Sequence, residues 1–441
     1  MLYLLGVLIM VVGIAASIAL HEIGHLVPAK LFRVRCTQYM VGFGPTLWST
    51  RRGETEYGVK AIPLGGYVRM IGMFPPRAGD GGRLRASSSN PMHLMIEQAR
   101  EESLEEVRPE DHDRVFYRLP VWKRVIIMAG GPLMNLALAF GLMAVLLMSH
   151  GVAVATPSIS TVATCANTDV ENEDCTGQPL SPAAEAGFEV GDTIVEVDGT
   201  PVQDWVSTTY AIQNAGEQAT FLVERDGARQ TLTADLVLRE RPLIGPDGEA
   251  LGLDDDGDPI TGRVGFLGAS PTVVMEKQPL TAVPPVVGEM FTGTAGIVLT
   301  LPQRLVDVSQ AAFGSEERDP DGPMSVVGVG RVAGEVTQDG AGGALETMGD
   351  RMWLLVSLVA SLNMALFVFN LIPLLPLDGG HIAGALWEGV KKTWARVFGR
   401  PEPGPVDTAA ALPVAYVVAI GLLGMTALLI YADIVRPVQL F

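Results

Sequence analysis

Long apolar runs alternate with polar segments along the chain. Three runs reach the roughly 20 residues that a helix needs to cross the hydrocarbon core of a bilayer, at residues 2–20, 125–148 and 412–431. A fourth run, 352–377, is as apolar but contains Asn363, Asn370, Pro373 and Pro376, so its second half is expected to unwind where protein or a cavity satisfies the backbone. The pattern predicts a polytopic α-helical membrane protein with four transmembrane helices.

Between the apolar runs, two regions have the composition of β-structure. The first contains two β-prone runs interrupted by Gly65-Gly66, which predicts a hairpin or a bent edge strand within 28–74. In the second, 155–240, alternating apolar positions and Asp-Gly turns predict a small β-rich domain with one short helix. The acidic run at 254–258 resembles a calcium loop, but the Glu that such a loop needs is missing, which favours a solvated loop.

These patterns predict nine consecutive segments. They are a first span at 1–27, the hairpin region at 28–74, a cytoplasmic linker at 75–119, a second span at 120–150, the β-rich domain at 155–240, an acidic loop with an amphipathic membrane-surface segment at 241–350, a third span at 351–382, a cytoplasmic loop at 383–408 and a fourth span at 409–435.

Composition and charge agree with a membrane protein and add an orientation. Hydrophobic residues make up 48% of the chain, and mean hydropathy is +0.30. Segment 26–124 has 16 Lys and Arg against 11 Asp and Glu, whereas 150–350 has 9 against 32, so the first loop is expected in the cytoplasm, and both termini and the β-rich domain outside. The acidic external part argues against a nucleic-acid partner. A cleaved signal peptide is the alternative for the first run, but Met1-Leu2-Tyr3 offers no basic start.

The three cysteines fit this orientation. Cys165 and Cys175 lie close together in a polar loop on the external side, where they could form a disulfide; the alternative is two unpaired small residues in a surface insertion. Cys36 lies on the reducing side and is expected to remain a free thiol.

The end of the first span carries a metal-binding pattern. In His21-Glu22-Ile23-Gly24-His25 the two histidines are four residues apart, which places them about 40° apart on one helix face, so that both can reach one zinc ion. Glu22 would act as general base toward a water whose pKa zinc lowers to near neutrality. The alternative is that these residues merely cap the helix at the cytoplasmic interface of the membrane. Three ionisable side chains at the end of a spanning helix are energetically costly, however, when they have no partner.

A catalytic zinc usually has a third protein ligand, and Asp378 is the candidate. It follows the irregular half of the third span, where Pro373 and Pro376 prevent regular helix and the next two glycines allow a sharp turn back into the bundle. His381 is the rival ligand. Asn370 could bind the substrate backbone or the oxyanion.

Together these motifs resemble the site-2 protease family of intramembrane zinc metalloproteases. The likeness rests on HEIGH at 21–25, on LDGG after Asn370 and Pro373, on GFGP at 42–45 and IPLGGYV at 62–68 in the hairpin, and on GGPLMN at 130–135. It is closest to the bacterial four-span members with an external PDZ domain. The resemblance implies Zn²⁺ held by His21, His25 and Asp378, a catalytic Glu22, and substrate contacts by Asn370, Pro373, Gly65, Gly66 and Tyr67.

The resemblance also implies a biological role. Such an enzyme in the plasma membrane would cleave single-span membrane proteins, such as anti-sigma factors, after an upstream site-1-type protease has cut them outside. The strand 62–69 could pair with the unwound substrate or be only structural. The PDZ-like domain could be a size filter or a receptor for the new carboxyl terminus. A catalytically inactive scaffold or chaperone is the main alternative function, and a transporter is a second.

Overall fold

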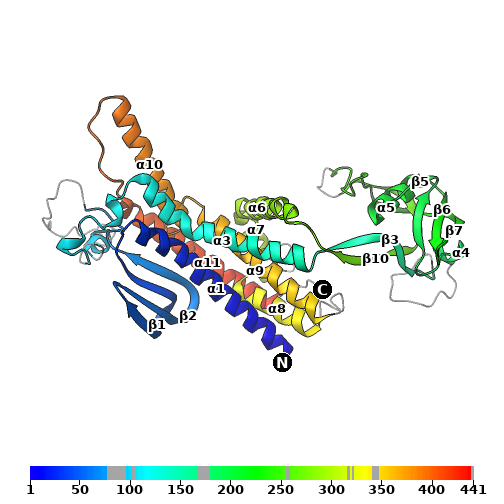
Figure 1. Cartoon of the computed structure of the whole chain (residues 1–441), viewed down its shortest axis with the longest axis horizontal. Helices are drawn as coiled ribbons and strands as arrows, with labels where there is room; N and C mark the ends of the chain where they lie inside the picture. Colours follow the sequence, from blue (N-terminus) through cyan, green and yellow to red (C-terminus); the bar gives the residue numbers. More distant parts are fainter. Residues whose placement is uncertain are drawn as a thin grey trace. The chain divides into compact units, whose positions relative to one another are not determined.

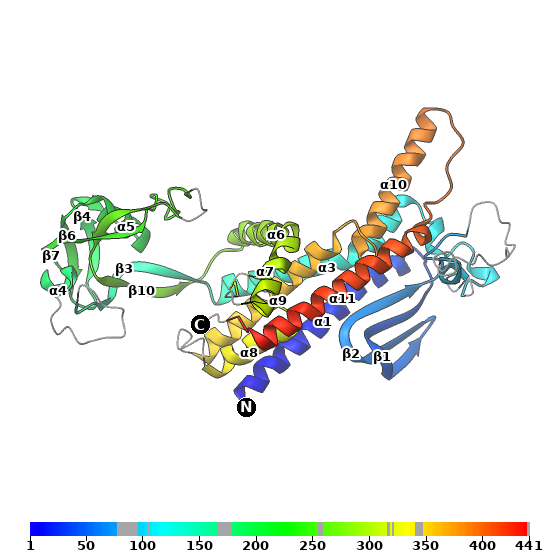
Figure 2. The ribbon, with the colours of Figure 1, turned by 180° about the vertical axis from the view of Figure 1, so that it is seen from behind.

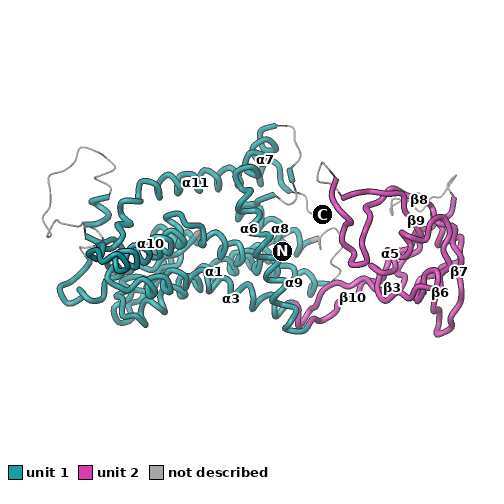
Figure 3. Tube along the Cα trace, turned by 90° about the horizontal axis from the view of Figure 1, so that it is seen from above, with its two compact units in different colours: residues 1–146, 279–441 teal, residues 147–278 magenta. Residues whose placement is uncertain are grey.

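The computed structural model describes residues 1–76, 96–101, 103, 106–165, 179–254, 259–314, 318–319, 322–339 and 347–438. The chain divides into two compact units (Figure 3). Unit 1 contains residues 1–146 and 279–441, and unit 2 contains residues 147–278.

Unit 1 is built mainly from helices (Figures 1 and 2). The α-helices are α1 (Leu2–Leu31), α3 (Val121–Ser149), α6 (Val283–Leu299), α7 (Leu301–Phe313), α8 (Val326–Asp339), α9 (Met348–Asn370), α10 (Asp378–Val397) and α11 (Leu412–Val435). Short 3-10 turns lie at Pro109–Asp111, Phe116–Arg118, Leu280–Ala282 and Thr408–Ala411.

Five helical stretches of the described chain are long and apolar enough to cross a membrane. Four of them, containing α1, α3, α9 and α11, coincide with the predicted spans. The fifth runs through α6 and has the lowest mean hydropathy of the five, 1.3 against 1.9 to 2.5. It falls in the segment that the sequence predicted as an amphipathic surface helix.

Helices α1 and α3 approach each other at a pair of glycines. A Cβ atom added to Gly24 would lie 2.2 Å from the carbonyl oxygen of Gly130, and one added to Gly130 would lie 2.0 Å from that of Gly24. Real side chains do not tolerate such distances, so only glycine allows the two backbones to come this close. This crossing is one residue away from His25 and sets the part of α3 that faces the histidines.

Helix α8 was not expected, because it lies in the segment 241–350 that was predicted as an acidic loop with one amphipathic segment. Its start is capped by Ser325, whose hydroxyl oxygen accepts hydrogen bonds from the backbone N–H groups of Val327 and Gly328 at 3.2 Å. One face of α8 is buried against α1, where Ala333 and Met10 belong to the same core cluster. The three glycines of α8 lower its helix propensity, and the contact with α1 stabilises the helix.

The predicted hairpin is formed by two long, irregular strands beside α1, β1 (Cys36–Arg52) and β2 (Thr55–Met70). Residues 38–41 of β1 pair with residues 66–69 at the end of β2 and also with residues 56–59 near its start. Residues 66–70 therefore form the outer strand of this small sheet, next to α1.

The third predicted span ends in an irregular segment. Helix α9 stops at Asn370, residues 371–377 form turns, and α10 begins at Asp378. Helix α10 covers residues 383–397 of the segment that was predicted as a cytoplasmic loop, 383–408. A buried ion pair of 2.6 Å between Arg124 of α3 and Glu388 of α10 connects these two helices.

Unit 2 contains the β-rich domain. Its main sheet has the order β10-β3-β4-β6-β7, with β5 on β4, and β8 pairs separately with β9. The strands are β3 (Val152–Val162), β4 (Thr193–Val197), β5 (Thr200–Pro201), β6 (Gln218–Arg225), β7 (Ala228–Asp235), β8 (Val237–Pro242), β9 (Thr261–Phe266) and β10 (Ala269–Glu276), and the helices are α4 (Pro182–Glu185) and α5 (Trp205–Asn214).

This unit is larger than the predicted domain. Strands β9 and β10 belong to the segment that was predicted as an acidic loop, and β10 pairs with β3, more than 100 residues earlier. The aromatic pair Phe188 and Phe221 lies in the unit's core, with ring centroids 5.2 Å apart. Cys36 is a buried free thiol. Cys175, which was predicted to form a disulfide with Cys165, lies outside the described residues. Residues 255–258 of the acidic run lie outside them too.

Candidate active site

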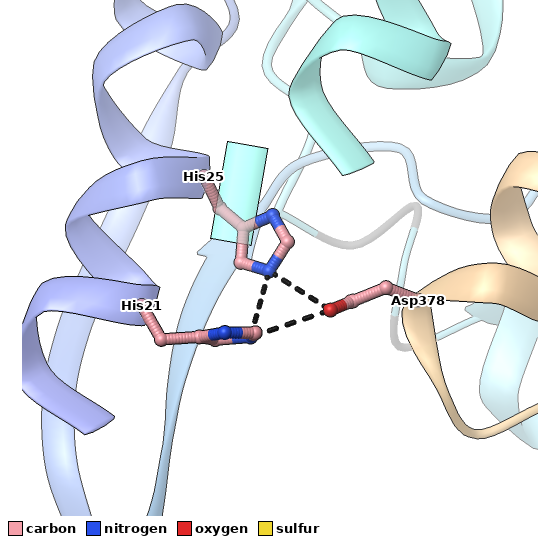
Figure 4. Close-up of side chains that lie close together, drawn as sticks. All are labelled: His21, His25 and Asp378. Atoms are coloured by element: carbon pink, nitrogen blue, oxygen red, sulfur yellow. Dashed lines mark hydrogen bonds and ion pairs between the residues drawn. The ribbon is translucent and has the colours of Figure 1, made fainter. Parts of the chain in front are cut away.

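Three side chains from distant parts of the sequence meet at the end of the bundle where α1 and α9 finish. His21 and His25 project from α1 toward Asp378, the first residue of α10 (Figure 4). Their Nε2 atoms are 3.2 Å apart, and each lies 3.3 Å from Oδ2 of Asp378. Within the described chain these three form the one group of histidine, cysteine or acidic residues with the spacing of a metal site.

The ring of His25 is held by the backbone of α3. Its Nδ1 lies 2.8 Å from the carbonyl oxygen of Ile127, which can only accept a hydrogen bond. Nδ1 therefore carries the proton and donates, and the neutral ring presents a lone pair at Nε2. A metal ligand held in this way has both its orientation and its tautomer fixed.

The ring of His21 is held by Asn135, also on α3. The amide Nδ2 lies 3.1 Å from His21 Nδ1, and Oδ1 of the same amide is buried with no partner. Turning the amide by half a rotation lets Oδ1 accept a hydrogen bond from Nδ1–H, which satisfies the oxygen. His21 then also presents a lone pair at Nε2 toward Asp378.

The donor set fits a zinc ion. Two imidazole lone pairs and a carboxylate oxygen face one another, and Oδ2 of Asp378 is buried without a hydrogen-bond partner. Three such acceptors repel one another unless a cation lies between them, and two His with one carboxylate form a common catalytic zinc set. The backbone of Gly131 leaves the space open, because an added Cβ would lie 2.2 Å from Nε2 of His25.

A cavity of about 280 Å³ contains this group and the predicted base. Glu22 is 9% exposed and lines it beside Asn370, Gly66 and Tyr67, which were predicted to contact substrate. The amide nitrogen of Asn370 donates to the carbonyl of Leu366, 3.0 Å away. His381 lines the cavity too but is not part of the three-residue group. Pro373 and Gly65 are not among the lining residues.

Several residues near the site had no role in the sequence predictions. Gly131 and Asn135 belong to the GGPLMN segment, whose resemblance was noted without a function for either residue. Met70, Met73 and Met128 also line the cavity, and no sequence signal separates them from core methionines. The signal that could have found Asn135 is an uncharged polar residue inside an apolar span, since such a side chain needs a partner.

The chain is similar to known metalloproteases over most of its length. The model of Peptidase family M50 matches residues 9–398. The chain is 33% identical to the zinc metalloprotease Rip1 of Mycobacterium tuberculosis, over the whole of both chains, and 32% identical to that of Mycolicibacterium smegmatis, also over both whole chains. It is 29% identical to the metalloprotease MmpA of Caulobacter vibrioides, with 88% of this chain and 89% of the relative covered.

Proposed function

The chain belongs to peptidase family M50, the site-2 protease family of membrane zinc metalloproteases, and from this premise we propose that it hydrolyses single-span membrane proteins beside or within the bilayer. The observation that carries the proposal is the meeting of His21, His25 and Asp378 in one cavity with Glu22. A purely structural zinc site has no need of a carboxylate base beside it, so Glu22 favours an enzyme over an inactive scaffold.

The residues of the cavity divide the chemistry between them. His21, His25 and Asp378 would hold the zinc ion, which when bound supplies a Lewis acid that polarises the scissile carbonyl and acidifies water. The carboxylate of Glu22 would take the proton from the attacking water and pass it to the leaving amine. The buried position of Glu22 keeps competing solvent away from this transfer.

The outer strand of the β1–β2 sheet would receive the substrate. A peptide bond within a helix is shielded by its own hydrogen bonds, so the substrate must be extended before water can attack it. Gly66, Tyr67 and Val68 line the cavity and belong to the segment 66–70, whose β-partner within the described chain lies on one side. We expect an unwound substrate to pair with its other side. Val68→Pro should then slow cleavage, and unchanged turnover would leave the strand a structural role.

A topology with four spans and both termini outside agrees best with a site that brings His25 and Asp378 together on one side of the membrane. Helices α1 and α9 both end at the zinc ligands, so the chain must cross the membrane an even number of times between them. The span α3 and the return through α9 fulfil this, whereas a further crossing by α6 would place Asp378 on the opposite side from His25. Four spans also keep both basic loops in the cytoplasm.

Unit 2 is proposed to be a PDZ-like external domain that acts as a size filter. The filter would admit a substrate, such as an anti-sigma factor, only after a site-1-type protease has removed its outer part. Deleting residues 160–238 should then permit cleavage of the full-length substrate. Loss of cleavage of the trimmed substrate would instead indicate a receptor for its new carboxyl terminus.

The decisive experiment is cleavage of a single-span substrate by the purified protein in detergent. Glu22→Gln and a zinc chelator should each abolish cleavage, and zinc should restore it only in the wild type. Glu110→Gln, at an exposed acid that does not line the cavity of the zinc ligands, is the matched control and should retain activity. Cleavage that persists in Glu22→Gln would assign the activity to another site and favour the scaffold.

A further inference from the structure

A second cavity lies where the first two spans begin and end. It has a volume of about 720 Å³ and is lined by residues from the end of α1, from the turn between β1 and β2, and from the segment that leads into α3. None of its lining residues is shared with the cavity that holds the zinc ligands. The two cavities are therefore distinct sites within unit 1.

The lining of this cavity carries an excess of positive charge. Five basic residues face two acidic ones, Glu54 and Asp113. Arg114 is paired with Glu54 at 2.5 Å, and Lys30 donates a hydrogen bond to the hydroxyl of Tyr57. Within the described chain, no ion pair involves the remaining three basic side chains, Arg33, Arg52 and Lys123, and the ammonium of Lys123 lies over the rings of Phe32 and Trp122. Three cations without a carboxylate partner around one cavity favour an anionic ligand.

The position of the cavity along the membrane-spanning helices indicates which kind of anion it binds. Helix α1 ends at Leu31 and α3 begins at Val121, so the cavity lies where the hydrocarbon of a bilayer gives way to headgroups. Phe32 and Trp122 meet edge to face beside it, with ring centroids 5.4 Å apart, and Trp122 is 56% exposed. Exposed aromatic residues at a span end are typical of the membrane interface.

We propose that this cavity binds the phosphate headgroup of an anionic phospholipid. Free phosphate offers the same charge, but the position at two span ends and the neighbouring exposed Leu31 and Trp122 favour a ligand with acyl chains. With the proposed topology, the lipid belongs to the cytoplasmic leaflet. Lys30 is five residues beyond His25 on the same helix, so the lipid would fix the last turn of the helix that carries the zinc ligands.

Thermal unfolding of the full-length protein in a neutral detergent tests the proposal. The probes are short-chain phosphatidylglycerol, short-chain phosphatidylcholine and inorganic phosphate, each titrated below micelle-forming concentration. A ligand that binds the folded state raises Tm with concentration and yields a Kd. Phosphatidylglycerol should raise Tm, and the other two should leave it nearly unchanged. An equal shift with phosphatidylcholine or with phosphate would overturn the proposal.

Charge-neutralising variants locate the site. The triple variant R33Q/R52Q/K123Q should weaken phosphatidylglycerol binding by about fivefold per charge, or roughly 100-fold together. The matched control R51Q/R396Q/R400Q removes as many charges on the same predicted side without touching the cavity, and its Kd should change less than about threefold. Because Tm is also measured without lipid, a folding defect is recognised separately. If both triple variants bound phosphatidylglycerol equally weakly, binding would depend only on the overall charge of this side of the protein, and a specific site would be refuted.

Discussion

Gly131 is the position where the smallest change should do most harm to the zinc site. Replacing it by alanine adds one methyl group 2.2 Å from Nε2 of His25 and 2.7 Å from Nε2 of His21. Ordinary contacts of a Cβ atom begin near 3.4 Å, so the ring of His25 would have to move by about 1.2 Å.

Such a movement is large for a metal ligand. Zinc–ligand distances tolerate changes of about 0.2 Å, and His25 cannot turn away without breaking its hydrogen bond to Ile127. Disturbing only the partners of a metal ligand already costs 10- to 100-fold in affinity. We therefore expect Gly131→Ala to lower zinc affinity by at least about 100-fold, which corresponds to about 2.7 kcal/mol.

The assay is zinc content and zinc affinity of the purified variant, with cleavage measured in parallel. Gly141→Ala is the matched control, since it lies in the same helix with no atom within 4 Å of an added Cβ. Both changes gain helix propensity, by up to about 1 kcal/mol, so propensity alone cannot explain a loss. Full zinc occupancy and normal cleavage in Gly131→Ala would refute the geometry argued for this site.

Three further results are expected. Asn135→Ala should weaken zinc binding by about 10- to 100-fold by releasing the ring of His21, and an unchanged zinc titration would contradict this. Glu388→Gln should lower the free energy of unfolding by on the order of 3 kcal/mol, measured by thermal unfolding, because it leaves the buried Arg124 without its ion pair. Glu402→Gln removes an exposed ion pair and should lower the free energy of unfolding by less than about 1 kcal/mol. Burial raises the pKa of Asp192, but hydrogen bonds from Arg225 and from a backbone N–H outweigh it, so the pKa is lowered. The stabilisation by the ionised carboxylate is complete above the pKa of Asp192 in the unfolded chain, near 4, and is lost as pH falls through its pKa in the folded protein. Acid unfolding of unit 2 should therefore depend less steeply on pH in Asp192→Asn. An identical pH profile in the variant would contradict the argument.

The helices of this fold could be predicted where the signal is local. The apolar runs that became α1, α3, α9 and α11 need only their own length and composition to be recognised. The spacing of His21 and His25 is also local, as one turn of helix fixes it. Asp378 could be proposed because prolines and glycines around it leave few regular conformations, and the structure brings it to the histidines.

What could not be predicted depends on contacts between distant segments. Helix α8 contains several glycines and is stabilised by packing on α1, and β10 is defined by pairing with β3. The importance of Asn135 and Gly131 comes from the crossing of α1 and α3, which no single window of the sequence contains. Periodicity describes what one segment can bury, and it does not name the partner.

The order of the proposed zinc ligands along the chain has a consequence for biosynthesis. His21 and His25 are made first, and Asp378 is made only after unit 2 and most of the bundle. A nascent or truncated chain that stops before α10 therefore lacks a ligand and has no assembled hydrolytic centre. With the proposed ligands, hydrolysis therefore requires synthesis to continue past Asp378.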